Sequence, residues 1–244
     1  MGATPVESLM PYTQAQASQA NAHRDNATYD TSALPPGFVL IHADPTFLIV
    51  SKPSGLLSVP GRGAEKQDCL ISRVQCDYPD ALIVHRLDCD TSGLLVLARG
   101  KAVHRQLSIA FQNRSVDKRY VALIDGKLEP DTGTVDLPLV VDWPNRPLHI
   151  VDFKIGKPSQ TRYRVLDYDA ARDQARVELI PETGRTHQLR VHMQALGHPI
   201  LGDSLYAKDK TCTGADRLLL HAEYLSFDHP LGGNRLEFFC AADF

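Results

Sequence analysis

A short polar segment of the chain combines one arginine with two aspartates: residues 85–93 read HRLDCDTSG. Apolar residues flank it, IV before and LLVLA after, and such runs are typical of buried strands. Because the connection is short, polar and ends in glycine, it presents Arg86, Asp88 and Asp90 at the edge of a core. A carboxylate beside an arginine, on a loop that a sheet holds in place, is a common way to position reactive groups.

A second segment also contains residues that could take part in chemistry. It spans residues 181–192 and reads PETGRTHQLRVH. Its pattern predicts a strand, a glycine turn and the start of a helix. Helix N-termini attract anions, and Arg185 is expected to lie at this one. His187, Arg190 and Gln194 occupy positions i, i+3 and i+7 and are expected to share the polar face of this helix. Arg190 is therefore expected to point out of the core toward another element.

The elements that must position these segments alternate between strands and helices. The first half of the chain predicts strands over 39–43 and 47–51, a helix over 68–76, a strand–loop–strand unit over 82–98 and a helix over 101–113. The second half predicts strands over 120–124, 161–168, 176–180, 218–222, 225–227 and 236–239, short proline-broken strands within 131–160, and a helix over 186–196. Helices scattered among many strands predict one α+β domain around a mixed sheet.

The N-terminal segment differs from the rest in composition. Residues 1–34 are rich in Ala, Gln, Ser, Thr and Asn and contain few large apolar side chains. Such a segment cannot bury enough surface to offset its ordering entropy. Pro35-Pro36-Gly37 closes it, so we expect a disordered or loosely attached tail over 1–37 and a globular domain over 38–244.

Composition is that of an ordinary globular protein: 244 residues, 43% hydrophobic and 23% charged. No run approaches the roughly 18–20 apolar residues that cross a bilayer, and the N-terminus lacks the pattern of a signal peptide. We therefore expect a cytoplasmic protein with no membrane partner. The net charge of −3 argues against a generic nucleic-acid coat, which would be broadly basic.

Cysteine and histidine spacing predicts no metal site. The five cysteines form no C-x-x-C pair, which favours reduced thiols over a disulfide framework or a zinc knuckle. His187 and His192 lie five residues apart, which is the wrong spacing for two ligands on one helical face.

Positive charge is concentrated in one stretch. Residues 99–119 contain six Lys or Arg, Arg105 and Lys118 among them, against the single acid Asp117. A solvated helix face is the simpler interpretation of such a cluster. Its position directly after the reactive segment favours a local phosphate-binding surface instead.

Three motifs together resemble one enzyme family. HRLDCDTSGL at 85–94, KRYVA at 118–122 and GRTHQLRVH at 184–192 match the order and approximate spacing of motifs in the RluA-type pseudouridine synthases. The resemblance continues through HPILGD at 198–203 and covers roughly residues 38–244. It implies a single catalytic domain with a central mixed, largely antiparallel β-sheet flanked by helices and loops. The residues before it are too few and too polar for the S4 domain that several relatives carry.

The resemblance also implies roles for individual residues. Asp88 corresponds to the essential carboxylate, Tyr120 to the active-site aromatic residue and Arg190 to the basic partner of the aspartate. Pseudouridine formation breaks the N-glycosidic bond of a uridine and rejoins the ribose through C5 of the same base, so neither a cofactor nor a metal is needed. Asp88 acts as nucleophile or as base, two alternatives that the sequence leaves open. The base must first be flipped out of the RNA, and Arg86 matches the arginine that fills the gap.

RNA is the implied partner, with no obligate protein partner. The chain resembles the smallest, dual-specificity type, which modifies a uridine in a 23S rRNA stem-loop and one in the anticodon stem-loop of certain tRNAs. Arg86, Arg185, His187, Arg105 and Lys118 are its candidate RNA-binding residues. Three alternatives stay open: a synthase with another rRNA or tRNA target, a non-catalytic RNA-binding protein of this fold, and an Asp-dependent hydrolase of small molecules.

Overall fold

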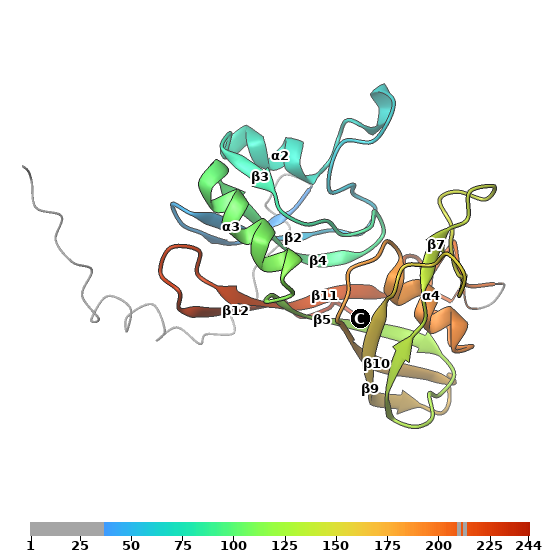
Figure 1. Cartoon of the computed structure of the whole chain (residues 1–244). Helices are drawn as coiled ribbons and strands as arrows, with labels where there is room; N and C mark the ends of the chain where they lie inside the picture. Colours follow the sequence, from blue (N-terminus) through green and yellow to red (C-terminus); the bar gives the residue numbers. More distant parts are fainter. Residues whose placement is uncertain (1–36, 209–210, 212–213) are drawn as a thin grey trace, which may run out of the picture. The chain divides into compact units, whose positions relative to one another are not determined.

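The computed structural model of the chain describes residues 37–208, 211 and 214–244. Within them, ten strands form one sheet in the order β1-β2-β4-β11-β5-β10-β9-β6, with β3 paired to β4 and β12 to β11 (Figure 1). The β4–β11 pairing is parallel and the others are antiparallel, so the predicted mixed, largely antiparallel sheet is confirmed. The predicted tail, apart from Gly37, lies outside the described residues.

Most predicted elements are present with shifted ends. The strands are β1 (Val39–Ala43), β2 (Phe47–Lys52), β3 (Ala81–Ile83), β4 (Ser92–Arg99), β5 (Asp117–Asp125), β6 (Thr132–Asp136), β7 (Leu139–Val141), β8 (His149–Val151), β9 (Gln160–Asp169), β10 (Gln174–Pro181), β11 (Leu220–Asp228) and β12 (Arg235–Phe239). The helices are η2 (Ala64–Lys66), α2 (Leu70–Asp77), α3 (Lys101–Gln112) and α4 (Gln188–Ala195). The two strands predicted at 218–222 and 225–227 are one strand, β11, whose pairing with β5 shifts register between Ala222 and Tyr224. No helix in the described ranges is long and apolar enough to cross a membrane.

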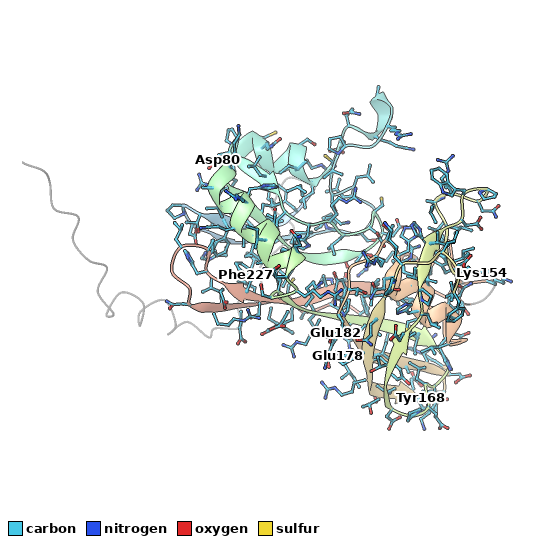
Figure 2. The ribbon with its side chains drawn as sticks, in the orientation of Figure 1. Asp80, Lys154, Tyr168, Glu178, Glu182 and Phe227 are labelled. Carbon is cyan, nitrogen blue, oxygen red and sulfur yellow. The ribbon has the colours of Figure 1, made fainter. Side chains whose placement is uncertain are left out.

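One half of the sheet is covered on both faces. Successive side chains of a strand point to opposite faces, so Leu48 packs with Leu70 of α2 while Phe47 packs with Leu107 of α3. Phe227 of β11 belongs to the same cluster as α3 (Figure 2). Burial on both faces explains why β2 and β4 read as continuous apolar runs rather than as alternating patterns.

The other half of the sheet has its own core beneath α4. Leu189 and Met193 of this helix pack with Ala122 of β5 and Val177 of β10. Tyr120 of β5 contacts both this core and the core under α2. The two cores therefore meet at the middle of the sheet, where β4, β11 and β5 are neighbours.

Gly93 allows the central strands to approach closely. Its φ is 110°, and a Cβ atom at this position would lie 2.3 Å from the carbonyl oxygen of Ala222 in β11. Only glycine combines this backbone conformation with this approach. Gly93, which ends the polar segment, thus allows β4 to pair with β11.

Candidate active site

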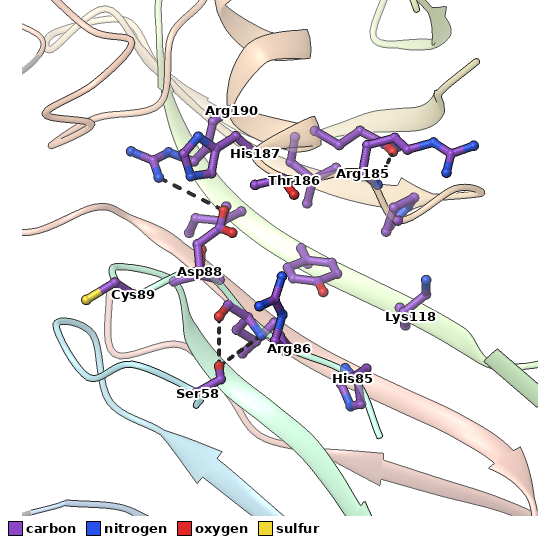
Figure 3. A pocket seen from close by; sticks show the side chains of 18 of the residues that line it. Ser58, His85, Arg86, Asp88, Cys89, Lys118, Arg185, Thr186, His187 and Arg190 are labelled. Atoms are coloured by element: carbon purple, nitrogen blue, oxygen red, sulfur yellow. Dashed lines mark hydrogen bonds and ion pairs between the residues drawn. The ribbon is translucent and has the colours of Figure 1, made fainter. Parts of the chain in front are cut away.

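A cavity of about 600 Å³ lies beside Tyr120, where the two cores meet (Figure 3). Parts of the chain that are far apart in the sequence line it: the connection between β3 and β4, the start of β5 and residues 181–190, together with Leu57, Ser58, Val59, Phe111 and Leu220. The two segments that the sequence singled out therefore face one cavity.

The loop over residues 84–91, which joins β3 to β4, is fixed by hydrogen bonds on both sides of Asp88. Ser58 Oγ donates to the carbonyl oxygen of Leu87 at 2.7 Å and accepts the N–H of Leu87 at 3.1 Å. The N–H of Thr91 donates to the carbonyl oxygen of Asp88 at 3.2 Å and closes a tight turn. These hydrogen bonds hold the backbone that carries the Asp88 carboxylate in place.

Lys52 supports the same loop from inside the protein. Its side chain is 1% exposed, and Nζ donates to the carbonyl oxygens of Pro53, Leu56 and Cys89 at 2.8, 2.7 and 2.8 Å. Burial lowers the pKa of Lys52 to about 8, although the nearby charge of Asp88 opposes the shift. Lys52 is therefore an ammonium at neutral pH, with a carbonyl acceptor for each of its three N–H bonds.

Asp88 faces a buried arginine. Nη1 of Arg190 lies 4.0 Å from Oδ2 of Asp88, and the two side chains point toward each other (Figure 3). Arg190 is 1% exposed, and its Nε and Nη2 donate to the two carboxylate oxygens of Asp203, both at 2.7 Å. Oδ1 of Asp203 also accepts the backbone N–H groups of Leu205 and Tyr206. Asp203 thereby fixes the guanidinium so that its remaining edge faces Asp88.

Tyr120 supplies an aromatic ring to the cavity wall. Burial, together with the negative charge of Asp88, raises the pKa of Tyr120 well above its usual value. The side chain is therefore a neutral phenol at neutral pH, with a ring face and a hydroxyl group to offer to a ligand.

Three cations lie along the cavity besides Arg190. Arg86 is exposed, and among the described residues it forms no ion pair with Asp88, Asp90 or any other acid. Lys118 is partly buried, which lowers its pKa. Nε of Arg185 donates to the carbonyl oxygen of Pro158 at 3.2 Å, while the residue itself is exposed.

A family model described as RNA pseudouridylate synthase matches residues 46–195, more than half of the chain. The chain belongs to this family. The dual-specificity RNA pseudouridine synthase RluA of Escherichia coli (strain K12) is 53% identical over 209 residues, which cover 86% of this chain and 95% of that protein. The protein of the same name from Yersinia pestis is 48% identical over 206 residues, 84% of this chain and 100% of that protein. Among solved structures, human RNA pseudouridylate synthase domain containing 1 has a TM-score of 0.71 at 30% identity and covers 86% of this chain and 87% of that one.

As a pseudouridine synthase the chain is an isomerase, and its cavity collects most of the predicted site residues. Those that line it are Arg86, Asp88, Lys118, Tyr120, Arg185, His187 and Arg190. Arg105 does not line it and lies on the exposed side of α3. Other members of the basic stretch have partners of their own: Arg99 pairs with Asp80, and the guanidinium of Arg119 lies 3.8 Å from the ring centre of Tyr224. Of the two residues of this stretch that are predicted to bind RNA, Lys118 lines the cavity and Arg105 does not.

The prediction that Arg190 shares an outward polar face with His187 and Gln194 is wrong. Arg190 is buried against Asp203, and only Gln194 is exposed. Helical spacing failed because α4 is buried on all sides over Gln188–Met193 and has no outward polar face at Arg190, while His187 precedes the helix with a left-handed backbone, φ 55°. Arg185 likewise lies before the helix, and its backbone N–H donates to the side chain of Gln188 at 3.0 Å.

Sequence reasoning missed the residues that hold the site from behind. Lys52, Ser58 and Asp203 are all buried and contact the loop or Arg190. A signal for Lys52 was available in the sequence, because the residue is a charge at the end of an apolar strand. A charge buried at such a position requires hydrogen-bond partners. Asp203 closes the HPILGD segment, but nothing local indicates that it binds an arginine earlier in the chain.

Proposed function

We propose that this enzyme converts uridine to pseudouridine in RNA stem-loops, with residues 38–244 as its catalytic domain and Asp88 as its catalytic carboxylate. The observation that carries the proposal is the carboxylate of Asp88 on an ordered turn, 4.0 Å from Nη1 of Arg190, in a cavity that Tyr120 also lines. The reaction detaches C1′ of the ribose from N1 of uracil and joins it to C5. Asp88 is suited to attack C1′ or to remove the 2′ proton, and either step requires it at the ribose.

Arg190 and Tyr120 complete the reaction site. The guanidinium of Arg190 attracts the carboxylate of Asp88 and sets its direction, because Asp203 leaves it no freedom to rotate away. Tyr120 stacks on the uracil ring while the base is detached and turned. Its raised pKa favours this stacking role over that of a base, since a base would need the phenolate form.

RNA enters the cavity only after the target base leaves its helix, at a cost of a few kcal/mol. Arg86 is exposed beside Asp88 and forms no ion pair within the described ranges, so its planar guanidinium is suited to enter the gap in the base stack. Lys118 and Arg185 lie along the same cavity and contact the phosphates that flank the flipped nucleotide.

A second contact with RNA forms at the β7–β8 hairpin and the turn that follows it. Trp143 and Phe153 are 65% and 77% exposed, and the guanidinium of Arg146 lies 4.5 Å from the ring centre of Trp143. Lys154 lies at the outer side of this region (Figure 2). Exposed aromatic rings beside cations suit unstacked bases and the phosphates between them.

The substrates proposed are a stem-loop of 23S rRNA and the anticodon stem-loop of certain tRNAs. The Escherichia coli relative, which is 53% identical over 209 residues, carries dual specificity in its name. A bacterial cytoplasm, which contains both RNAs, is the proposed location.

Tritium release from RNA labelled at C5 of uridine tests the proposal. Wild-type protein is expected to release tritium from both stem-loops, and Asp88→Asn is expected to release none while it still binds them. Asp90→Asn is the matched control, because it makes the same change two residues away on the same loop. It is expected to retain most of the activity.

Each other result has a defined meaning. Release from one RNA alone would restrict the substrate and keep the chemistry. Activity in Asp88→Asn would refute the role of Asp88. Binding without release from either RNA would favour a different target RNA, and then a non-catalytic RNA-binding protein.

A further inference from the structure

Tyr206 is a buried tyrosine that packs behind the active site. It is 6% exposed, its ring centre lies 5.2 Å from the guanidinium carbon of Arg190, and it belongs to a small core with Leu139 and Val191. Its hydroxyl group makes two hydrogen bonds: it accepts the backbone N–H of His149 at 2.9 Å and lies 2.7 Å from Nδ1 of His187.

The direction of the second hydrogen bond follows from the first. The N–H of His149 occupies one acceptor position of the Tyr206 oxygen, and the hydroxyl proton still needs an acceptor. In the described part of the chain, Nδ1 of His187 is the one acceptor in hydrogen bond with it. Tyr206 therefore donates to Nδ1, and the proton of the neutral imidazole must sit on Nε2. Burial lowers the pKa of His187, which keeps this neutral form at neutral pH.

The backbone of His187 aims its ring at the cavity. His187 caps the N-terminus of α4 with φ 55°, a left-handed conformation that few residues other than glycine adopt. A backbone conformation of this kind persists only where its surroundings enforce it, and such positions cluster at functional sites. The ring of His149 packs edge-on against that of His187 at 5.3 Å between centres, and Tyr206 holds it from a second side.

The free edge of His187 lies close to the place where the ribose must bind. Its ring lies beside Arg190 and above the carboxylate of Asp88 (Figure 3). Under the proposed function Asp88 acts at C1′ or at the 2′ proton, and these atoms flank the carbon that bears the 2′-hydroxyl group. No described residue forms a hydrogen bond with Nε2 of His187.

We propose that Tyr206 and His187 form a relay that presents the Nε2–H group to the 2′-hydroxyl oxygen of the target nucleotide, so that this pair recognises ribose. His187 is the binding residue, and Tyr206 is a positioning residue that acts through it. The inference rests on the proposed function, because Asp88 locates the ribose. The 2′-hydroxyl group is the feature by which a protein distinguishes RNA from DNA at a given nucleotide.

The test compares two stem-loops that differ in one atom: one carries uridine at the target position and the other 2′-deoxyuridine. Affinities are measured by fluorescence anisotropy in an Asp88→Asn background, so that the RNA is not converted. The parent protein is expected to bind the uridine stem-loop about three- to tenfold more tightly, the range of one hydrogen bond. Tyr206→Phe and His187→Asn are expected to lose this preference, with unchanged affinity for the deoxyuridine stem-loop.

Two controls separate recognition from folding. His187→Asn suits the left-handed backbone, which asparagine tolerates, and Tyr163→Phe removes a hydroxyl group from another buried tyrosine that does not line the cavity. Tyr163→Phe is expected to keep the full preference for uridine. Equal weakening of both stem-loops, or a preserved preference in both variants, would overturn the inference. Absence of tritium release by the wild-type protein from the uridine stem-loop would instead overturn the proposed function.

Discussion

The substitution Asp203→Asn tests how much the buried negative charge that pairs with Arg190 contributes to stability. Asp203 is 0% exposed and accepts four hydrogen bonds, two from Arg190 and two from backbone N–H groups. Asparagine keeps the shape of the side chain but removes its charge and replaces one acceptor oxygen with an amide donor. Arg190 is then left buried with two weaker negative neighbours, Asp88 at 4.0 Å and Asp90.

Removing one partner of a buried ion pair costs about 3–5 kcal/mol, because the other charge stays out of water without compensation. The oxygen that asparagine retains and the neighbouring Asp88 reduce the penalty. We therefore expect the free energy of unfolding to fall by about 3 kcal/mol, at the lower end of this range.

Urea denaturation at pH 7, followed by far-ultraviolet circular dichroism, measures this loss. Asp68→Asn is the matched control: Asp68 also forms a two-point ion pair, with Arg73 at 2.7 and 2.6 Å, but at the surface. Solvent screens that pair, so the control is expected to leave the free energy of unfolding nearly unchanged. Equal losses in the two variants would refute the argument that burial makes the Arg190–Asp203 pair matter.

Three further substitutions test other parts of the site. Lys52→Met should lower the free energy of unfolding by about 2 kcal/mol and slow tritium release. Three buried carbonyl oxygens lose their donor, and removal of the desolvated charge offsets this loss only in part. An unchanged urea midpoint would contradict this prediction. Arg86→Ala should leave stability within about 0.5 kcal/mol of wild type, since the side chain is exposed, yet slow single-turnover tritium release at least about tenfold; unimpaired turnover on a stem-loop would exclude a flipping role. Trp143→Ala should weaken stem-loop binding about tenfold, the loss expected for one stacked base, with the urea midpoint preserved.

Local pattern was enough to predict most of the strands and the polar loop before β4. The run after Gly93 is apolar throughout because β4 is buried on both faces, and that burial makes it recognisable without knowledge of its neighbours. The polar residues between two such strands must leave the core, so Asp88 was placed at its edge correctly. The order of the strands in the sheet could not be predicted in this way, because β11 pairs with β4 from more than a hundred residues away.

The environment of Arg190 depended on contacts that no local rule contains. Helical spacing assigned it to an outward face, but α4 is buried on all sides from Gln188 to Met193. The carboxylate of Asp203, thirteen residues after Arg190, holds the guanidinium inside the protein. The same limit applies to the basic stretch, in which Arg105 and Lys118 look equivalent. Only the packing of α3 and β5 determines that Lys118 reaches the cavity.

The site lies where the core beneath α4 meets the core under α2. Each half of the sheet is buried beneath its own helices, and Tyr120 is shared between them. At this junction β4 meets β11 in parallel, which is possible because Gly93 leaves room for the backbone of Ala222. Leu87 of the loop before β4 packs into the core under α2, while the next residue, Asp88, faces Arg190 of α4. Polar side chains from both halves converge at this point and line one cavity.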